Sequence, residues 1–465
     1  MADSPGVRSR DPSSSAIEAI TRAMIVLAAT ALPAVARAGN ADSFYFSDDA
    51  AMTAGAVTAT THDAGAIWYN PAGLGGIERG ELNLSGSTFL VRVRPEANAL
   101  TTSIAGAPTQ TIGLSSVNVD SAPHALAFVR SLSPRVSVGL GIYITALDER
   151  TADNQINFVA ETLPIQQRLD LSSSSTVYHA GPAIGVQVLP SLRLGAALFA
   201  TYGTYDFFAQ YVLVGESPGS APATVKFLWA ENRYTFTYFG TQASAGAQWE
   251  PVSGLELGLL FRTPEFLLAP SAEGASIGAE GSVAPLSSAA AAVITQETSS
   301  LSAFSTVSPA RLVGSVAGRF GPTVVSGEVD YQTAVSTPSF LQQPTVNGRV
   351  GVRVQATKRI GFGFGLFTDR STERAPAAGI GNDKVDYYGG TVGIQYRRSL
   401  SLADHKPADG LVLMTTLAVR YAVGVGEANA NTVTVTSTGD VITGTHTTSV
   451  LYQEVAPYIG TGLLF

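Results

Sequence analysis

The sequence predicts an all-β protein, a 14-stranded antiparallel transmembrane β-barrel preceded by a compact N-terminal segment that is not part of the wall. Three observations support this prediction. The 465 residues include 47 glycines but only 14% charged residues, and the mean hydropathy is +0.20. Apolar and polar residues alternate along many segments, and short connections take turns with long ones. Low charge and alternating segments without a long apolar helix are typical of a barrel in lipid.

Composition also excludes several function classes. The net charge is -8, so no basic field exists to attract nucleic acid. The chain has no cysteine, and its five histidines lack the spacing of metal ligands, so we predict no disulfide, metal or cofactor. Residues 215–219 match G-x-S-x-G, but Pro218 after the serine has no N–H for an oxyanion hole. We therefore expect no enzyme activity.

The first residues have the pattern of an export signal. Arg8, Arg10 and Arg22 precede a mostly apolar stretch, residues 23–36, and Ala36-Arg37-Ala38 matches an A-x-A cleavage site. We predict a signal peptide over residues 1–38, with a native helix as the alternative. No later run approaches the ~20 apolar residues of a membrane helix.

Residues 81–465 are predicted to form the barrel wall. In the segment 360–366, four large apolar residues alternate with three glycines, and 135–145 alternates in the same way. A strand with one apolar and one polar face suits a barrel with its apolar side toward lipid. The same parity places Arg135, Arg193, Arg262, Arg319, Arg349, Arg353, Arg397 and Arg420 in the lumen with Glu256, Glu328 and Asp330. These arginines could bind a cargo carboxylate, or they could pair with charges of the wall, plug and turns.

The connections predict the number of strands. Short or intermediate links occur near 133, 190, 251–254, 321, 357–359 and 399–410. Long stretches are read as outer loops at 95–122, 150–170, 206–226, 271–308, 333–346, 369–385 and 426–449. Seven long and six short links join 14 strands, with both barrel ends on the short-turn, periplasmic side of a bacterial outer membrane. The strands must close into a ring because hydrocarbon offers no partner to an open edge.

Two local features belong to the predicted wall. The parity of apolar residues changes within the first strand, which predicts a bulge near Gly86. The segment 455–465 is the predicted closing strand, and its C-terminal Phe465 resembles the signal read by the bacterial barrel-assembly machinery.

Residues 39–80 lack a period of two and are rich in small residues. They contain Phe46-Ser47, Gly55-Ala56, Asp63-Ala64 and Asn70-Pro71-Ala72, in that order. This segment closely resembles the N-terminal hatch of the FadL-type transporters of long-chain fatty acids and other hydrophobic compounds.

The resemblance implies a monomeric 14-stranded barrel in the outer membrane, with residues 39–80 as an N-terminal hatch, or plug, inside its lumen. It also implies passive uptake of a hydrophobic small molecule, such as a fatty acid or an aromatic hydrocarbon. Outer loops would capture the cargo, the lumen would bind it, and movement of the hatch would release it sideways into outer-membrane lipid. The exit would lie at a kinked third strand, about Arg135 to Glu149.

The candidate hatch or gate residues are Asn70, Pro71, Ala72, Asp63 and Phe46. Pro71 fixes its own φ near -65° and keeps Asn70 out of helix, so the tripeptide forms a rigid polar turn. The resemblance makes this turn part of the gate, and an ordinary turn is the alternative.

The candidate substrate-binding residues are Phe207, Phe208, Tyr211, Leu213 and Trp68. The first four belong to 206–214, which is unusually apolar for a loop, and an alanine-rich run at 289–292 predicts a short helix nearby. Together they could form an apolar groove. Alternatively, 206–214 extends the fifth strand and 284–301 is a spacer.

Other classes of outer-membrane barrel remain as alternatives. A general porin would lack a plug and conduct ions, and a surface adhesin would not depend on Asn70. A barrel lipid hydrolase would need a lipid-facing serine–histidine pair, which the sequence does not supply.

Overall fold

The computed structural model describes residues 44–104, 108–160, 163–217, 224–283, 291–297, 306–336, 341–376, 381–400, 410–435 and 441–465. The predicted signal peptide, residues 1–38, and the first residues of the predicted hatch lie outside the described residues. No described helix is long and apolar enough to cross a membrane.

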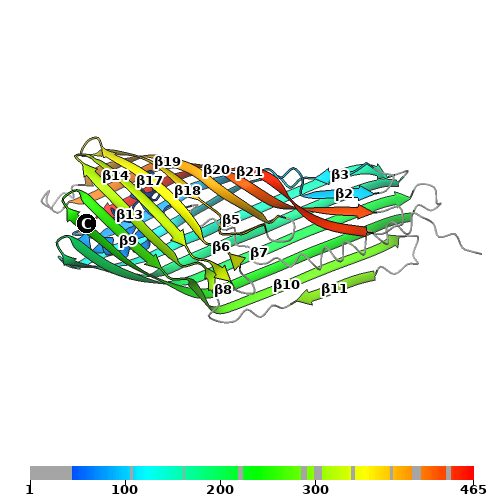
Figure 1. Ribbon diagram of the computed structural model, residues 1–465, viewed down its shortest axis with the longest axis horizontal. Coiled ribbons are helices and arrows are strands. Elements are labelled where there is room, and N and C mark those ends of the chain that lie inside the picture. Colours follow the sequence, from blue (N-terminus) through cyan, green and yellow to red (C-terminus); the bar gives the residue numbers. More distant parts are fainter. Residues whose placement is uncertain are drawn as a thin grey trace, which may run out of the picture.

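The described strands form a closed antiparallel barrel with 14 wall positions (Figure 1), as predicted. Each wall strand pairs with the next, and the last pairs back with the first from Glu81↔Leu464 to Val93↔Gln453. Both ends of the wall therefore lie on the short-turn side. The wall comprises β1 (Glu81–Arg94), β4 (Ser116–Ser133), β5 (Val136–Ala160), β6 (Leu163–Leu189), β7 (Leu192–Ser217), β8 (Thr224–Val252), β9 (Leu255–Arg262) continued by β10 (Glu265–Val283), β13 (Arg311–Phe320), β14 (Thr323–Gln332), β17 (Thr345–Gln355), β18 (Ile360–Asp369), β19 (Asp383–Leu400), β20 (Leu411–Val435) and β21 (Val441–Leu464).

The wall is apolar outside, as the alternation predicts. On β18, Phe362, Phe364 and Leu366 are exposed, whereas Gly363 and Gly365 between them are buried. This outward apolar belt is the arrangement expected in lipid rather than in water. The predicted bulge is also confirmed, because the register of β1 against β4 shifts between Ser85 and Gly86.

Several wall strands are much longer than predicted. The stretches 150–170, 206–226 and 426–449, predicted as loops, consist mostly of paired strand, with Arg150 opposite Ser173 and Phe207 opposite Tyr234. The loop prediction was wrong there because polar residues continue on the outer face while apolar residues face inward. β8 has 29 residues and would span roughly 95 Å at about 3.3 Å per residue. Only about 9–11 residues of a strand are needed to cross the hydrocarbon.

The long strands build an extension beyond the apolar belt, drawn at the right of Figure 1. β2 (Leu100–Ile104) joins it, parallel to the end of β20 and paired with β3 (Gln110–Ile112). Further short strands are β11 (Ala291–Glu297), β12 (Thr306–Ser308), β15 (Val335–Ser336) and β16 (Leu341–Gln342). The extension has its own apolar core, which includes Leu100, Ile112, Leu169, Phe207, Tyr211, Leu213, Tyr234, Phe236, Leu267 and Val433.

Residues 44–80, named here the N-terminal segment, form no wall strand. They contain the short helices α2 (Asp48–Met52), α3 (Ala66–Tyr69) and η1 (Pro71–Gly76). Ser47 caps α2 by accepting a hydrogen bond from the N–H of Ala50 at 3.3 Å. Most of the segment is buried, and its helices pack against β5 to β8 and β18 to β21.

The C-terminal residue closes the wall. Phe465 and Gly80 exchange two backbone hydrogen bonds of 3.0 Å, and the Phe465 ring stacks on Phe128 with centroids 6.1 Å apart. We expect Phe465→Ala to lower the amount of assembled barrel several-fold, since it removes this stack and the proposed assembly signal. The amount of assembled barrel is measured from the heat-modifiable electrophoretic mobility of the protein in membrane fractions. Phe320→Ala, at another exposed aromatic beside a short turn, is the matched control, and equal assembly of the two variants would contradict the prediction.

Candidate functional site

Asn70 ties the N-terminal segment to the wall. Its side chain is fully buried, and its amide nitrogen donates to the carbonyl oxygens of Thr58 at 2.8 Å and Ala247 on β8 at 3.1 Å. Its Oδ1 accepts a hydrogen bond from the N–H of Ala72 at 3.2 Å and so caps η1. Pro71 occupies the first position of that helix, where no N–H is needed. The predicted turn is thus a helix cap that also bonds to the wall.

A row of wall glycines lies beneath this turn, and sequence analysis missed it. Gly185 on β6 pairs with Gly195 on β7, which pairs with Gly246 on β8. A Cβ at Gly195 would lie 2.2 Å from the carbonyl carbon of Pro71, and one at Gly246 would lie 1.9 Å from Oδ1 of Asn70. The segment therefore approaches the wall more closely than any side chain would permit. Register-matched glycines on three neighbouring strands were the signal available in the sequence.

Asp63 belongs to a group of carboxylates between the segment and the wall. Its Oδ1 accepts hydrogen bonds from the Thr61 hydroxyl and the Gly65 N–H, both at 3.0 Å. The neighbouring Ala64 N–H donates to Glu81 at the start of β1 at 2.9 Å. Burial, with Asp49 and Asp48 nearby, raises the pKa of Asp63 to about 7. The hydrogen bonds to its charged form only partly offset the burial.

This raised pKa predicts that the N-terminal segment docks less firmly at high pH. Between about pH 4 and pH 7, Asp63 binds more protons when docked than when free, so docking weakens as the pH rises through the raised pKa. We expect amide-exchange protection factors for residues 44–77 to be lower at pH 8 than at pH 5. Asp63→Asn should flatten this dependence. The same pH profile in wild type and variant would contradict the assignment to Asp63.

Aromatic rings connect the segment to the wall. Phe46 and Trp68 lie 5.2 Å apart, and Trp68 is also 5.2 Å from Tyr143 on β5 and 5.5 Å from Phe199 on β7. The Arg262 guanidinium lies 3.9 Å above the Trp68 ring and donates to the Trp68 carbonyl oxygen at 2.6 Å. The structure thus brings together Phe46, a predicted gate residue, and Trp68, a predicted substrate contact.

A cavity of about 210 Å³ lies beside this cluster. Phe44 and Trp68 border it from the N-terminal segment, and residues of at least six wall strands complete it. Its wall mixes rings such as Tyr205 with charged groups. The charged lining residues are Arg92, Arg94, Asp148, Arg150, Arg262, Glu265, Arg311, Asp383 and Glu454.

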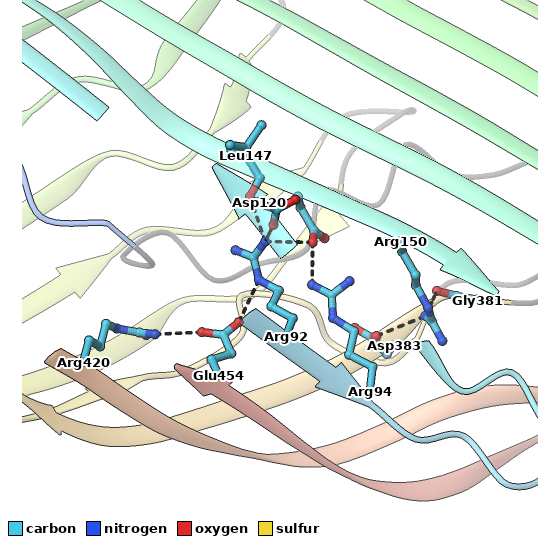
Figure 2. Close-up of polar contacts among 10 residues, drawn as sticks. Arg92, Arg94, Asp120, Leu147, Arg150, Gly381, Asp383, Arg420 and Glu454 are labelled. Carbon is cyan, nitrogen blue, oxygen red and sulfur yellow. Dashed lines mark hydrogen bonds and ion pairs between the residues drawn. The ribbon is translucent and has the colours of Figure 1, made fainter. Parts of the chain in front are cut away.

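Four of the arginines that line this cavity have acidic partners, namely Arg92, Arg94, Arg150 and Arg311. Figure 2 draws the first three of them. In Figure 2, Arg94 bonds Asp148 at 2.5 Å, and Arg420, beside the cavity, bonds Glu454 at 2.7 Å. Arg150 also bonds Glu96 at 2.8 Å. Elsewhere in the lumen, Arg349 pairs with Glu328, Arg353 with Asp49 and Arg319 with Glu256. This pattern favours charge pairing over a free cation held ready for a cargo carboxylate.

The remaining predicted substrate contacts lie farther out. Phe207, Tyr211 and Leu213 are buried in the apolar core of the extension, whereas Phe208 lies on the other face of β7. The stretch 206–214 therefore extends the fifth wall strand, which was the alternative interpretation. Ala291 and Ala292 belong to β11 and not to a helix, because they pair with β10, and residues 289–290 lie outside the described residues.

The wall is incomplete beside the cavity. Backbone pairing between β4 and β5 runs from Ser133↔Val136 only to Ala125↔Tyr143. Beyond that point β4 continues with β1, and β5 continues with β6 after a register shift between Ile144 and Ala146. The edges formed by β4 residues 116–124 and β5 residues 144–160 have no backbone pairing with each other in the described chain. This break lies along the β4 side of the third wall strand, the strand at which the sequence resemblance implied an exit.

Solved structures share this architecture. A FadL homologue from Pseudomonas aeruginosa is 12% identical, with a TM-score of 0.55 over 92% of this chain and 99% of that chain. The chain has the FadL-type fold. The CymD monoaromatic hydrocarbon channel matches this FadL-type barrel with 12% identity and a TM-score of 0.51, over 90% of this chain and 97% of that chain. A deltaS2 mutant of the TodX monoaromatic hydrocarbon channel is 12% identical, with a TM-score of 0.55 over 90% of this chain and 98% of that chain. No family model and no curated protein matches the sequence.

Proposed function

We propose that this FadL-type barrel lies in the bacterial outer membrane as a monomer and takes up hydrophobic small molecules passively. The observation that carries the proposal is the cavity at the break between β4 and β5. A molecule in this cavity is separated from the surrounding lipid by a part of the wall in which β4 and β5 are not joined by backbone pairing. The channel names of the similar CymD and TodX structures agree with this function.

Residues 39–80 are the proposed hatch, and residues 81–465 are the proposed barrel. Asn70, Pro71 and Ala72 hold the hatch against β6 to β8, and the N–H of Ala64, next to Asp63, bonds Glu81 on β1. Phe46 packs against Trp68, whose ring borders the cavity. A shift of the hatch would therefore change the floor of the cavity and release its contents.

The cargo would be largely apolar. Phe207, Tyr211 and Leu213 belong to the buried apolar core of the extension, and with Phe208 they are the proposed capture residues. A molecule leaving sideways gains about 0.8 kcal/mol for each CH₂ group that it buries in hydrocarbon. Release into lipid would thus need no other energy source. Long-chain fatty acids and aromatic hydrocarbons are the two proposed cargo classes.

Uptake by cells tests this function. Cells lacking their own uptake barrels would express the protein, and uptake of a labelled fatty acid and of labelled toluene would be compared with that of empty-vector cells. We expect faster uptake of at least one of them. No increase for either at normal surface abundance, together with large steady conductance in planar bilayers, would favour a general porin instead. Mass spectrometry of copurifying ligands would identify the cargo class.

A further inference from the structure

Two side chains of β1 reach the unpaired edge of β5. Arg92 on β1 donates from Nη1 to the backbone carbonyl oxygen of Leu147 at 2.8 Å. This bond supplies an edge carbonyl of β5 with a donor that a neighbouring strand would normally provide. Nη1 also lies 3.1 Å from Oδ1 of Asp148, and Arg94 reaches the same oxygen at 2.5 Å.

The Arg92 guanidinium also bonds two other wall strands. Arg92 bonds Asp120 on β4 at 2.5 Å and, through Nε, Glu454 on β21 at 3.1 Å (Figure 2). Arg92 thus links β1, β4, β5 and β21. Its side chain is only 4% exposed, and those of Asp120 and Glu454 are 2% and 4% exposed. Removing one partner of an ion pair this deeply buried is energetically costly, because the remaining buried charge is neither paired nor solvated.

The ion pairs lie between the cavity and the lipid. Arg92, Leu147 and Asp148 all line the cavity. On the outer face at the same break, Val117 and Val119 of β4 are 67% and 56% exposed. A path from the cavity to the apolar surroundings therefore crosses the bonds between Arg92 and the β5 edge.

We propose that Arg92 and Asp148 form a latch that closes the wall between β4 and β5 and sets the rate at which cargo leaves the cavity. This inference rests on the proposed uptake function. In the closed state Arg92 and Arg94 hold Asp148, and the bond to Leu147 keeps the β5 edge against β1 and β4. Separation of Asp148 from the two arginines frees the β5 edge and opens the cavity to lipid.

Asp148→Asn tests the latch with a matched control on the same strand. Asp153 on β5 pairs with Arg168 at 3.0 Å, but both side chains are about half exposed and lie away from the cavity. Asp148→Asn weakens charge-assisted bonds to Arg92 and Arg94, whose side chains are only 4% and 8% exposed. We therefore expect roughly tenfold faster cargo release for Asp148→Asn and no change for Asp153→Asn. Amide exchange at residues 144–150 should also accelerate only in Asp148→Asn.

A cross-link tests the closed state without relying on charge removal. The chain has no cysteine, and the carboxylates of Asp120 and Asp148 both bond Nη1 of Arg92, so their side chains lie close together. In the double variant Asp120→Cys, Asp148→Cys, release should be fast while the thiols are free. It should stop when a short bis-methanethiosulfonate reagent joins the two thiols through disulfides, releasing methanesulfinate, and resume after a reductant cleaves those disulfides. A fluorescent fatty acid should still bind the linked protein.

The outcomes separate the latch from the function. Suppose that the wild type takes up cargo and that Asp148→Asn and the linked double variant both behave like the wild type. That result would overturn the latch and leave the uptake function standing. Wild type that takes up nothing would overturn the function and the role of the latch in it. Unchanged exchange at 144–150 in Asp148→Asn would overturn the latch by itself.

Discussion

Gly195→Val is expected to turn the barrel into an open, ion-conducting pore. The Cβ of any residue at this position would lie 2.2 Å from the carbonyl carbon of Pro71 and 2.4 Å from the nitrogen of Ala72. Both are backbone atoms of η1, so no side-chain rotation relieves the overlap, and the N-terminal segment must move away from β7. Valine suits a strand, so the wall itself should still form. Planar-bilayer conductance and sensitivity of cells to a large antibiotic measure the result.

Gly327→Val is the control for this prediction. Gly327 lies on wall strand β14, and a Cβ there meets nothing within 4 Å. It makes the same chemical change without touching the N-terminal segment, so its conductance should equal that of the wild type. A folded Gly195→Val barrel that stays as closed as Gly327→Val would show that the segment does not block the lumen.

The wall was predictable because the polarity of each residue indicates whether its side chain faces the lipid or the lumen. Phe362 and Phe364 with glycines between them indicate a strand with an apolar outer face, and lipid imposes that pattern on every wall strand. The order of short and long connections then gave the number of strands. The N-terminal turn was found by resemblance, since Asn70-Pro71-Ala72 has no periodicity of its own.

The extension and the cavity were not predictable in the same way. The residues 206–214 are unusually apolar for a loop, but only their pairing with β8 shows that Phe207 and Tyr211 face an apolar core. The Arg92 cluster joins residues separated by as many as 362 positions. Such pairs depend on the closure and register of the whole barrel, which local pattern does not determine.

Asn70→Ala is expected to loosen the N-terminal segment without opening the wall. The substitution removes three hydrogen bonds at a fully buried site, from Asn70 to Thr58, to Ala247 and from Ala72. Losing them should cost roughly 2 to 4 kcal/mol of docking free energy, since buried partners are left unsatisfied. Amide exchange across residues 44–77 should accelerate accordingly, and the rate of cargo uptake should change because the proposed hatch is no longer held.

Two further variants show which bond matters. Asn70→Asp keeps the oxygen that caps η1 but loses the two bonds donated to Thr58 and Ala247. If it loosens the N-terminal segment as much as Asn70→Ala does, the effect comes from the bonds to Thr58 and β8 rather than from the cap. Asn154→Ala removes one side-chain bond, to Gly113, in the extension and should leave the segment unchanged. Unaltered uptake and exchange in Asn70→Ala, at equal surface abundance, would reduce Asn70-Pro71-Ala72 to an ordinary turn. The glycine row beneath it would then serve packing alone.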